Sequence, residues 1–425
     1  MKIIDIDTLK KTNFLILLVF PVFFILGNSF INLGVIILTF SAFLLYFSNK
    51  LDPFSKVENI LFGVFFFYIS INSLINYTEF NNFLKSIALF RYIFFSAAVV
   101  YTLKNTSFEQ LKKIKYLYLF IIFFVILDII FQYFSGSDFF GFKPGMCEEA
   151  YCLRYQGPFG KELIAGSFFA YFGLVVIIFF FKNETLNYLL LVLGVVILIT
   201  GDRSPFITYI IFFTIYIIIS NQKFIKKFFL LFLSVVIFLT TINTLKSTKM
   251  RYVDFLKNIS YSEINKFEKE KNLKNFLEDA RNSPWGKHYQ VALAMFLEKP
   301  ILGHGYNSFR IKCSSYEQET RTDTGSHKGC STHPHNSFLQ ILSEQGLIGF
   351  FILSAIILCA LKRIFTLRFK NKDVRIKFVL SAVLFLCFYF PLKPTGSLFS
   401  SWLGSITFFT YSFYLFFLDK NKSHN

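Results

Sequence analysis

Long apolar blocks without a helical stripe recur from one end of this chain to the other. Phe62–Ile75, Tyr118–Phe134 and Leu189–Thr200 are clear examples. A helix built from such a block is apolar on every side, which suits lipid or the interior of a helix bundle. Only 16% of the 425 residues are charged, whereas a soluble domain carries about 25%. The blocks therefore argue against a soluble helical protein and predict an all-α fold, a polytopic membrane helical bundle.

About twelve membrane-spanning helices are expected, because a helix needs about 20 apolar residues to cross the hydrocarbon core. The first follows Lys10 and Lys11 but lacks a small-residue cleavage site, so we interpret it as a retained helix and not as a signal peptide. The chain is expected to act as one functional unit, with about nine spans in residues 1–243, a large loop at 244–336 and further spans in 337–425. The predicted spans lie near residues 12–28, 30–48, 58–76, 83–103, 116–134, 163–181, 186–200, 204–220, 228–243, 337–360, 378–391 and 398–418.

Positive charges predict the orientation, because cytoplasmic loops of membrane proteins are enriched in Lys and Arg. With the N-terminus in the cytoplasm, the inside segments hold 22 Lys or Arg and the short outside loops hold five. The large loop then faces outside, which its own charge allows, since long loops translocate largely regardless of charge. The net charge of +18 thus reflects topology, membrane lipid and an anionic substrate, and nucleic acid is not an expected partner.

The cysteines give an independent test of this topology. Cys147, Cys152, Cys313 and Cys330 all fall on segments placed outside, and disulfides persist in oxidising compartments such as the bacterial periplasm. Of three connectivities, Cys147–Cys152 with Cys313–Cys330 is preferred because the partners are near in sequence. A zinc site is the competing interpretation, but no CxxC pair supports it, so no metal is expected. The cysteines favour a bacterial inner-membrane protein whose large loop is periplasmic.

The segment His333-Pro334-His335-Asn336 carries the sharpest chemical signal. It lies where the large loop meets a predicted span, and Asn336, Gln340 and Ser343 give that span a polar stripe. An imidazole at such a boundary can accept a proton near neutral pH. His335 is therefore a candidate general base, with His333 as its main rival. The alternative is an interfacial histidine that only caps the helix.

Basic residues at or within the membrane are the next candidates. Arg203 is the one fully charged cation in a three-residue outer turn, where the positive-inside bias disfavours it. A lipid-headgroup anchor is its alternative role. Arg91 is expected inside the fourth span and Asp128 at a similar depth in the fifth. Since ionisable groups in a bilayer are usually paired or functional, a structural Arg91–Asp128 pair is predicted in preference to a catalytic role.

These motifs resemble the O-antigen ligase and Wzy-type polymerase superfamily, which also includes protein O-oligosaccharyltransferases. His335-Asn336, nine residues and then Gly346-x-x-Gly349 is similar to the signature of that family. The preceding run from Lys299 to Phe309, which reads KPILGHGYNSF, is similar to a second family segment. The resemblance implies a bundle of the glycosyltransferase-C type with a cavity open to the periplasm.

Weaker similarities extend the resemblance over most of the chain. Arg281 with Trp285 fits the family's entry into an amphipathic helix that is expected from Trp285 to Leu297. The stretch 154–160, RYQGPFG, resembles a family loop, although Lys161-Glu162 stands where that loop has an Asn. The stretch 200–204, TGDRS, resembles the family's TgSR, with Asp202 in place of the first Ser.

The resemblance implies a glycosyltransferase that uses an undecaprenyl-pyrophosphate-linked glycan as donor. Breaking the bond between the anomeric carbon and the pyrophosphate creates negative charge, which fixed guanidiniums can stabilise without a metal or another cofactor. His335 is assigned the base, and Arg203 and Arg281 the catalytic cations. The residues expected to contact substrate are Arg91, Arg154, Lys161, His333 and Asn336.

The acceptor is the open question at this stage. A ligase would transfer the glycan to a sugar hydroxyl of lipid A–core, whereas a polymerase would transfer the growing chain to the next repeat unit. We favour the ligase because one compact loop of about 90 residues with a single His-Asn segment resembles that branch. The alternatives are the polymerase, a protein O-oligosaccharyltransferase and, in another class, a flippase for lipid-linked oligosaccharide. A flippase usually has two related halves, and this chain has one large loop only.

Overall fold

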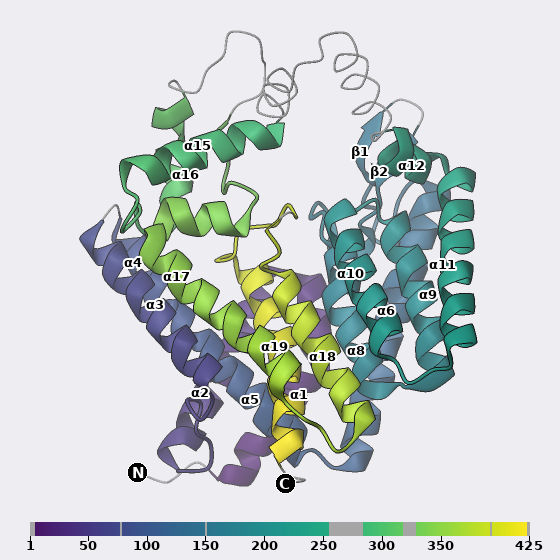
Figure 1. The fold of residues 1–425 in the computed structure, drawn as a ribbon, viewed down its shortest axis with the longest axis horizontal. Coiled ribbons are helices and arrows are strands. Elements are labelled where there is room, and N and C mark those ends of the chain that lie inside the picture. Colours follow the sequence, from purple (N-terminus) through teal and green to yellow (C-terminus); the bar gives the residue numbers. More distant parts are fainter. Residues whose placement is uncertain are drawn as a thin grey trace.

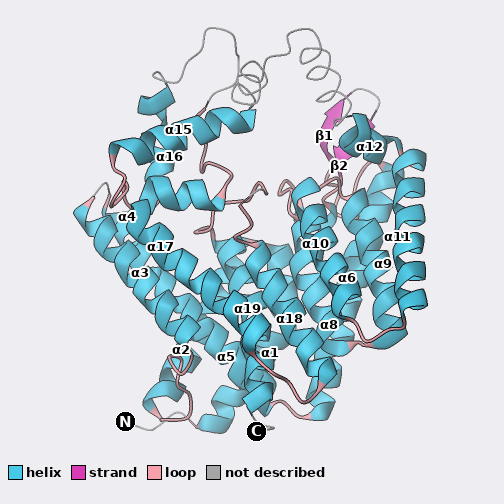
Figure 2. Cartoon of the chain, viewed as in Figure 1, coloured by secondary structure: helices cyan, strands magenta, loops and turns pink. Residues whose placement is uncertain are grey.

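The computed structural model describes residues 5–76, 79–148, 151–254, 284–317, 329–391 and 393–422, and most of this part is helical (Figure 2). The first half runs through α1 (Ile6–Leu26), α2 (Asn28–Phe47), α3 (Val57–Ile75), α4 (Phe80–Ile87), η1 (Ala88–Phe90), α5 (Arg91–Asn105) and α6 (Phe108–Ser135). A two-stranded antiparallel hairpin follows, β1 (Gly145–Glu148) and β2 (Tyr151–Arg154). Next come η2 (Gly157–Phe159), α7 (Ala165–Ser167), the π-helix η3 (Phe168–Gly173), α8 (Leu174–Phe180), α9 (Asn183–Ile199), α10 (Arg203–Ile219) and α11 (Phe224–Thr244).

The remaining elements are α12 (Lys246–Lys249), the π-helix η4 (Met250–Asp254), α15 (Pro284–Glu298), α16 (Ser308–Glu317), α17 (Ser337–Thr366), α18 (Lys372–Cys387) and α19 (Ser401–Lys422). Helix α15 confirms the amphipathic helix expected from Trp285 to Leu297. Arg281 lies outside the described residues.

The helices confirm an all-α polytopic membrane protein. Among the described residues, eight helices are long and apolar enough to cross a bilayer, and three shorter apolar helices accompany them, at residues 165–180, 184–199 and 203–219. Each of the twelve predicted spans falls on a helical segment, α18 included. The exact number of spans stays a prediction.

Two helices show how the bundle divides its apolar surface. Helix α19 packs against α18 and α5 at the centre of the fold, and 89% of the residues in its apolar stretch are buried. In helix α11 only 17% of the residues in the apolar stretch are buried, and its first residue, Phe224, is 81% exposed. Apolar surface on this scale is a lipid-facing or partner-facing surface in a folded protein, so α11 belongs to the rim of the bundle.

The molecule has two chemically different ends (Figure 1). Both termini lie at one end, which we call the terminal end. There Lys56 and Lys104 both pair with Asp419 of α19, and Arg363 pairs with the buried Glu58. The hairpin, α12, α15 and α16 lie at the opposite end, which we call the loop end.

The predicted disulfide Cys313–Cys330 is confirmed, and it ties α16 to the chain that precedes α17. It excludes these two thiolates as ligands of the alternative zinc site. Cys147 is also disulfide-bonded, and the hairpin register places it directly opposite Cys152.

The predicted Arg91–Asp128 pair is wrong. Residues 136–142 fold back over the end of α6, so that the N–H of Phe139 donates to Asp128 Oδ1 at 2.7 Å. Arg91 instead donates through Nη2 to the hydroxyl of Tyr92 at 3.2 Å. Each group found a local partner that hydropathy could not reveal, and no ion pair joins the two within the described residues.

Candidate active site

The signature glycines build a broken helix at the loop end. Gly346 interrupts α17 with φ 62° and ψ −164°, a conformation that side chains disfavour. The carbonyls of Pro300 and Ile301 accept the N–H groups of Leu347 at 2.8 Å and Ile348 at 3.3 Å. A Cβ on Gly346 would lie 2.3 Å from the Ile301 oxygen. A glycine is therefore required at position 346, because the backbone of the 299–309 segment packs directly against the interruption in α17.

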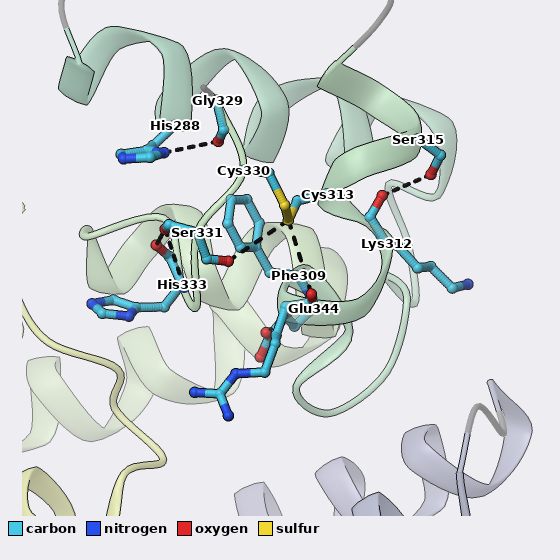
Figure 3. Close-up of a disulfide and its surroundings, with 11 residues drawn as sticks. His288, Phe309, Lys312, Cys313, Ser315, Gly329, Cys330, Ser331, His333 and Glu344 are labelled. Carbon is cyan, nitrogen blue, oxygen red and sulfur yellow. Dashed lines mark hydrogen bonds between the residues drawn. A yellow bond between two sulfur atoms is a disulfide. The ribbon is translucent and has the colours of Figure 1, made fainter. Parts of the chain in front are cut away.

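The same segment also bonds the last carbonyls of the short first part of α17. The N–H groups of His304 and Gly305 donate to the carbonyls of Ser343 at 3.1 Å and Glu344 at 2.8 Å. The Glu344 carboxylate, fully buried, accepts from the N–H groups of Asn307 and Phe309 at 3.3 Å and so caps α16 (Figure 3). The two motifs thus form one interlocked unit that fixes the start of α17.

His335 sits immediately before this unit. Its φ of 55° is unusual for a residue with a side chain, and its carbonyl accepts the N–H of Thr395 at 2.9 Å. Asn336 caps α17 through Oδ1, which accepts from Phe338 and Leu339, while its Nδ2 donates to the carbonyl of Pro391 at 2.7 Å. Asn336 therefore holds the helix start, and its predicted contact with substrate stays a prediction.

Three histidines and a tryptophan gather around this point, and we call them the histidine cluster: Trp285, His288, His333 and His335. The His335 ring centroid lies 4.1 Å from that of His333, 4.7 Å from that of Trp285 and 5.3 Å from that of His288. Both ring nitrogens of His333 have partners, the Thr332 hydroxyl at 2.9 Å and the Thr395 carbonyl at 3.2 Å. His288 bonds the carbonyl of Gly329 at 2.8 Å (Figure 3).

The cluster keeps His333 and His335 neutral. Burial, followed by the neighbouring His333 and His288, lowers the pKa of His335 to about 3. Burial also lowers the pKa of His333 to about 4. Imidazole can accept a proton only when it is neutral, so His335 has the protonation state that a base needs.

A second group, the arginine cluster, surrounds the turn between α9 and α10: Arg154, Asp202, Arg203 and Arg251. Asp202 is only 4% exposed, pairs with Arg154 and accepts the N–H of Gly166 at 2.9 Å. Arg154 also donates to the carbonyl of Leu163 at 3.0 Å. The Asp that departs from the family's TgSR pattern is thus the ion-pair partner of Arg154.

Arg203 opens α10 beside this pair, and its charge interacts with those of Arg251 and Arg154. Arg251 donates through Nε to the carbonyl of Gly201 at 3.0 Å, and burial next to Arg154 lowers its pKa. Sequence reasoning missed Arg251, although its place a few residues after the α11 span was a usable signal. Within the described residues, three guanidiniums surround one carboxylate, an excess of positive charge that suits an anion site.

The loop between α18 and α19, residues 388–400 without 392, joins the two clusters, and we call it the linking loop. The Ser204 hydroxyl donates to the carbonyl of Pro394 at 2.6 Å, and Ser204 directly follows Arg203. The next residue, Thr395, donates to the His335 carbonyl. His335 and Ser204, the neighbour of Arg203, are therefore bonded to adjacent residues of one loop, at the same end of the bundle.

The other predicted site residues lie further out. Lys161 is exposed near the hairpin. Arg91 lies at the start of α5, where its charge acts on Tyr306. Neither shows a direct contact with the two clusters within the described residues, and their contact with substrate stays a prediction.

A cavity of about 590 Å³ opens at the other end of the molecule. Its lining includes Lys182, Lys223 and Lys377, together with Ile178 and Leu380. The histidine and arginine clusters both lie at the loop end, so this cavity is not part of the candidate site.

Comparison with known proteins agrees with the motifs. No curated protein sequence matches the chain. Residues 188–354 match the protein-family model described as O-antigen ligase. The matched segment begins in α9 and ends in α17, and it contains Arg203, the 299–309 segment and His335. This match supports the resemblance to the O-antigen ligase and Wzy-type polymerase superfamily that the motifs indicated.

Proposed function

We propose that this protein is an O-antigen ligase-like glycosyltransferase of the bacterial inner membrane. It would move a glycan from an undecaprenyl-pyrophosphate donor to a sugar hydroxyl of lipid A–core at the periplasmic face. The observation that supports this most is that His335 and Ser204, which directly follows Arg203, are bonded to neighbouring residues of the linking loop. A neutral base and a cationic anion site at one end of a membrane bundle are the two parts that such a transfer needs.

The reaction breaks one bond and forms one. The acceptor hydroxyl oxygen attacks the anomeric carbon, the bond from that carbon to the pyrophosphate oxygen breaks, and undecaprenyl pyrophosphate leaves with the electron pair. His335 takes the hydroxyl proton. Arg203 and Arg251 stabilise the charge that develops on the pyrophosphate, because guanidiniums can bind phosphate oxygens in a bidentate way. Arg281 is proposed as a further cation.

The low pKa of His335 fits this order of events. Before the donor binds, desolvation keeps His335 neutral. A nearby pyrophosphate adds negative charge, which favours the protonated imidazole and so raises its pKa. The base therefore becomes stronger when the donor is in place.

The orientation follows from charge and sulfur chemistry. The basic segments of the terminal end belong in the cytoplasm by the positive-inside rule, and the disulfide Cys313–Cys330 belongs in an oxidising compartment. The loop end would then face the periplasm, where lipid-linked glycans and lipid A–core meet.

Lipopolysaccharide gels of a deletion strain test the proposed acceptor. A ligase predicts lipid A–core without polymer, together with accumulated lipid-linked polymer, and rescue by the wild-type gene. Lipid A–core bearing one repeat unit would identify a polymerase instead. Unchanged lipopolysaccharide with lost protein glycosylation would identify a protein acceptor.

A further inference from the structure

A buried lysine stands in the linking loop between the two clusters. Lys393 is 3% exposed, and its ammonium donates to the hydroxyls of Tyr171 at 2.5 Å and Thr208 at 2.9 Å. Tyr171 belongs to the π-helix η3 and Thr208 to α10. One side chain of the loop is thus anchored to two elements of the bundle interior.

This arrangement is costly for a cation. Hydrogen bonds to neutral acceptors offset little of the free energy lost when an ammonium leaves water, so buried lysines usually pair with a carboxylate. Within the part of the chain that the structure describes, no ion pair includes Lys393. A neutral side chain would fill the same space with a smaller desolvation cost. What the ammonium adds is its hydrogen bonds to two fixed hydroxyls.

The residues that follow Lys393 explain the value of a fixed anchor. Pro394 accepts the hydroxyl of Ser204, next to Arg203, and Thr395 holds the His335 backbone and the His333 ring. A shift of the loop would therefore move the base relative to the arginine cluster. Catalytic groups that are misplaced by about 1 Å can lose about 100-fold in rate.

We infer that Lys393 is a positioning residue for glycosyl transfer, because its ammonium anchors the linking loop that sets the placement of His335 relative to Arg203. The inference rests on the proposed function. Lys393 would not touch the donor or the acceptor, since both described partners of its ammonium are hydroxyls of the bundle.

The test is steady-state transfer by purified full-length protein in lipid nanodiscs, with lipid-linked glycan as donor and lipid A–core as acceptor. Lys393→Met is expected to lower kcat by about 10- to 100-fold while the donor KM changes less than about threefold. Lys393→Arg keeps the charge and the donors, so it should recover part of the kcat. Lys377→Met is the matched control, because Lys377 on α18 donates to the carbonyl of Phe179 at 2.8 Å and lines the cavity of the terminal end.

Two milder variants keep the test valid if Lys393→Met does not fold. Tyr171→Phe and Thr208→Val each remove one acceptor of the ammonium, and each should lower kcat by less than Lys393→Met does. A folded Lys393→Met protein with the wild-type kcat would overturn the inference. So would a raised donor KM with unchanged kcat, which would make Lys393 a donor-binding residue. Absence of transfer by the wild-type protein would instead refute the proposed function.

Discussion

The histidine cluster and the arginine cluster differ in the charge that they hold. Around His335, burial among aromatic rings disfavours the charged imidazolium, so that His333 and His335 stay neutral. Around Arg203, the part of the chain that the structure describes gathers three guanidiniums near one buried carboxylate, so that positive charge is concentrated. Desolvation favours the neutral form of a lone group, whereas a paired and hydrogen-bonded charge can remain buried. A transfer reaction needs both environments, and the linking loop holds them together.

The strongest way to break this comparison is to remove the base. His335→Ala is expected to lower kcat by about 10²- to 10⁴-fold, the usual contribution of a general base. The measurement is transfer in nanodiscs together with export of lipid-linked glycan in cells. His288→Gln is the control, because His288 belongs to the same cluster but bonds the carbonyl of Gly329.

Export decides between the two functional classes. Normal export with lost transfer by His335→Ala fits a glycosyltransferase. Failed export would instead identify a flippase and contradict the assignment of His335 as a base.

The arginine cluster is sharpened by separating its structural pair from its remaining charge. Arg154→Ala leaves the carboxylate of Asp202 buried without its partner, which typically costs about 3–5 kcal/mol. The expected result is a clearly lower Tm in detergent. Adding Asp202→Ser removes the stranded charge and should recover most of that loss. If the double variant melted no higher than Arg154→Ala, the ion pair would not be what stabilises this turn.

The smallest expected effect concerns pH and the histidine cluster. His333 and His335 have folded-state pKa values of about 4 and about 3, below the ordinary 6.5. Between the folded-state pKa values and 6.5, the unfolded chain therefore binds more protons than the folded protein does. The free energy of unfolding should fall as the pH drops from about 6.5 toward 4. The measurement is the Tm across that range. A His333→Gln/His335→Gln protein should show a weaker dependence, and an equal slope for both proteins would contradict the desolvated cluster.

Hydropathy and charge predicted much of this molecule, because both report how deep a segment lies in a membrane. The helical segments at the predicted spans and the shared end of His335 and Arg203 followed from such signals, and the disulfide Cys313–Cys330 followed from the topology that they predicted. Depth does not say which side chains meet across helices. The Arg91–Asp128 pair was wrong for that reason, since both groups found local partners.

The same limit explains what was missed in the site. Arg251 and Asp202 come together with Arg154 only because the chain returns to the α9–α10 turn from two directions. Lys393 was one more outside lysine by sequence, and only the packing of α10 and η3 reveals that it is buried. The break at Gly346 needed the 299–309 segment in place.

Accessibility labelling tests the central claim most directly, namely that His335 and Arg203 face one aqueous site on the periplasmic side. The experiment places a single cysteine at either position, replaces the free thiols Cys359 and Cys387 with alanine, and applies a membrane-impermeant maleimide to each side separately. Both positions should react from the periplasmic side, and the lipid-linked donor should slow both reactions. Reaction of either cysteine from the cytoplasmic side alone would contradict the account.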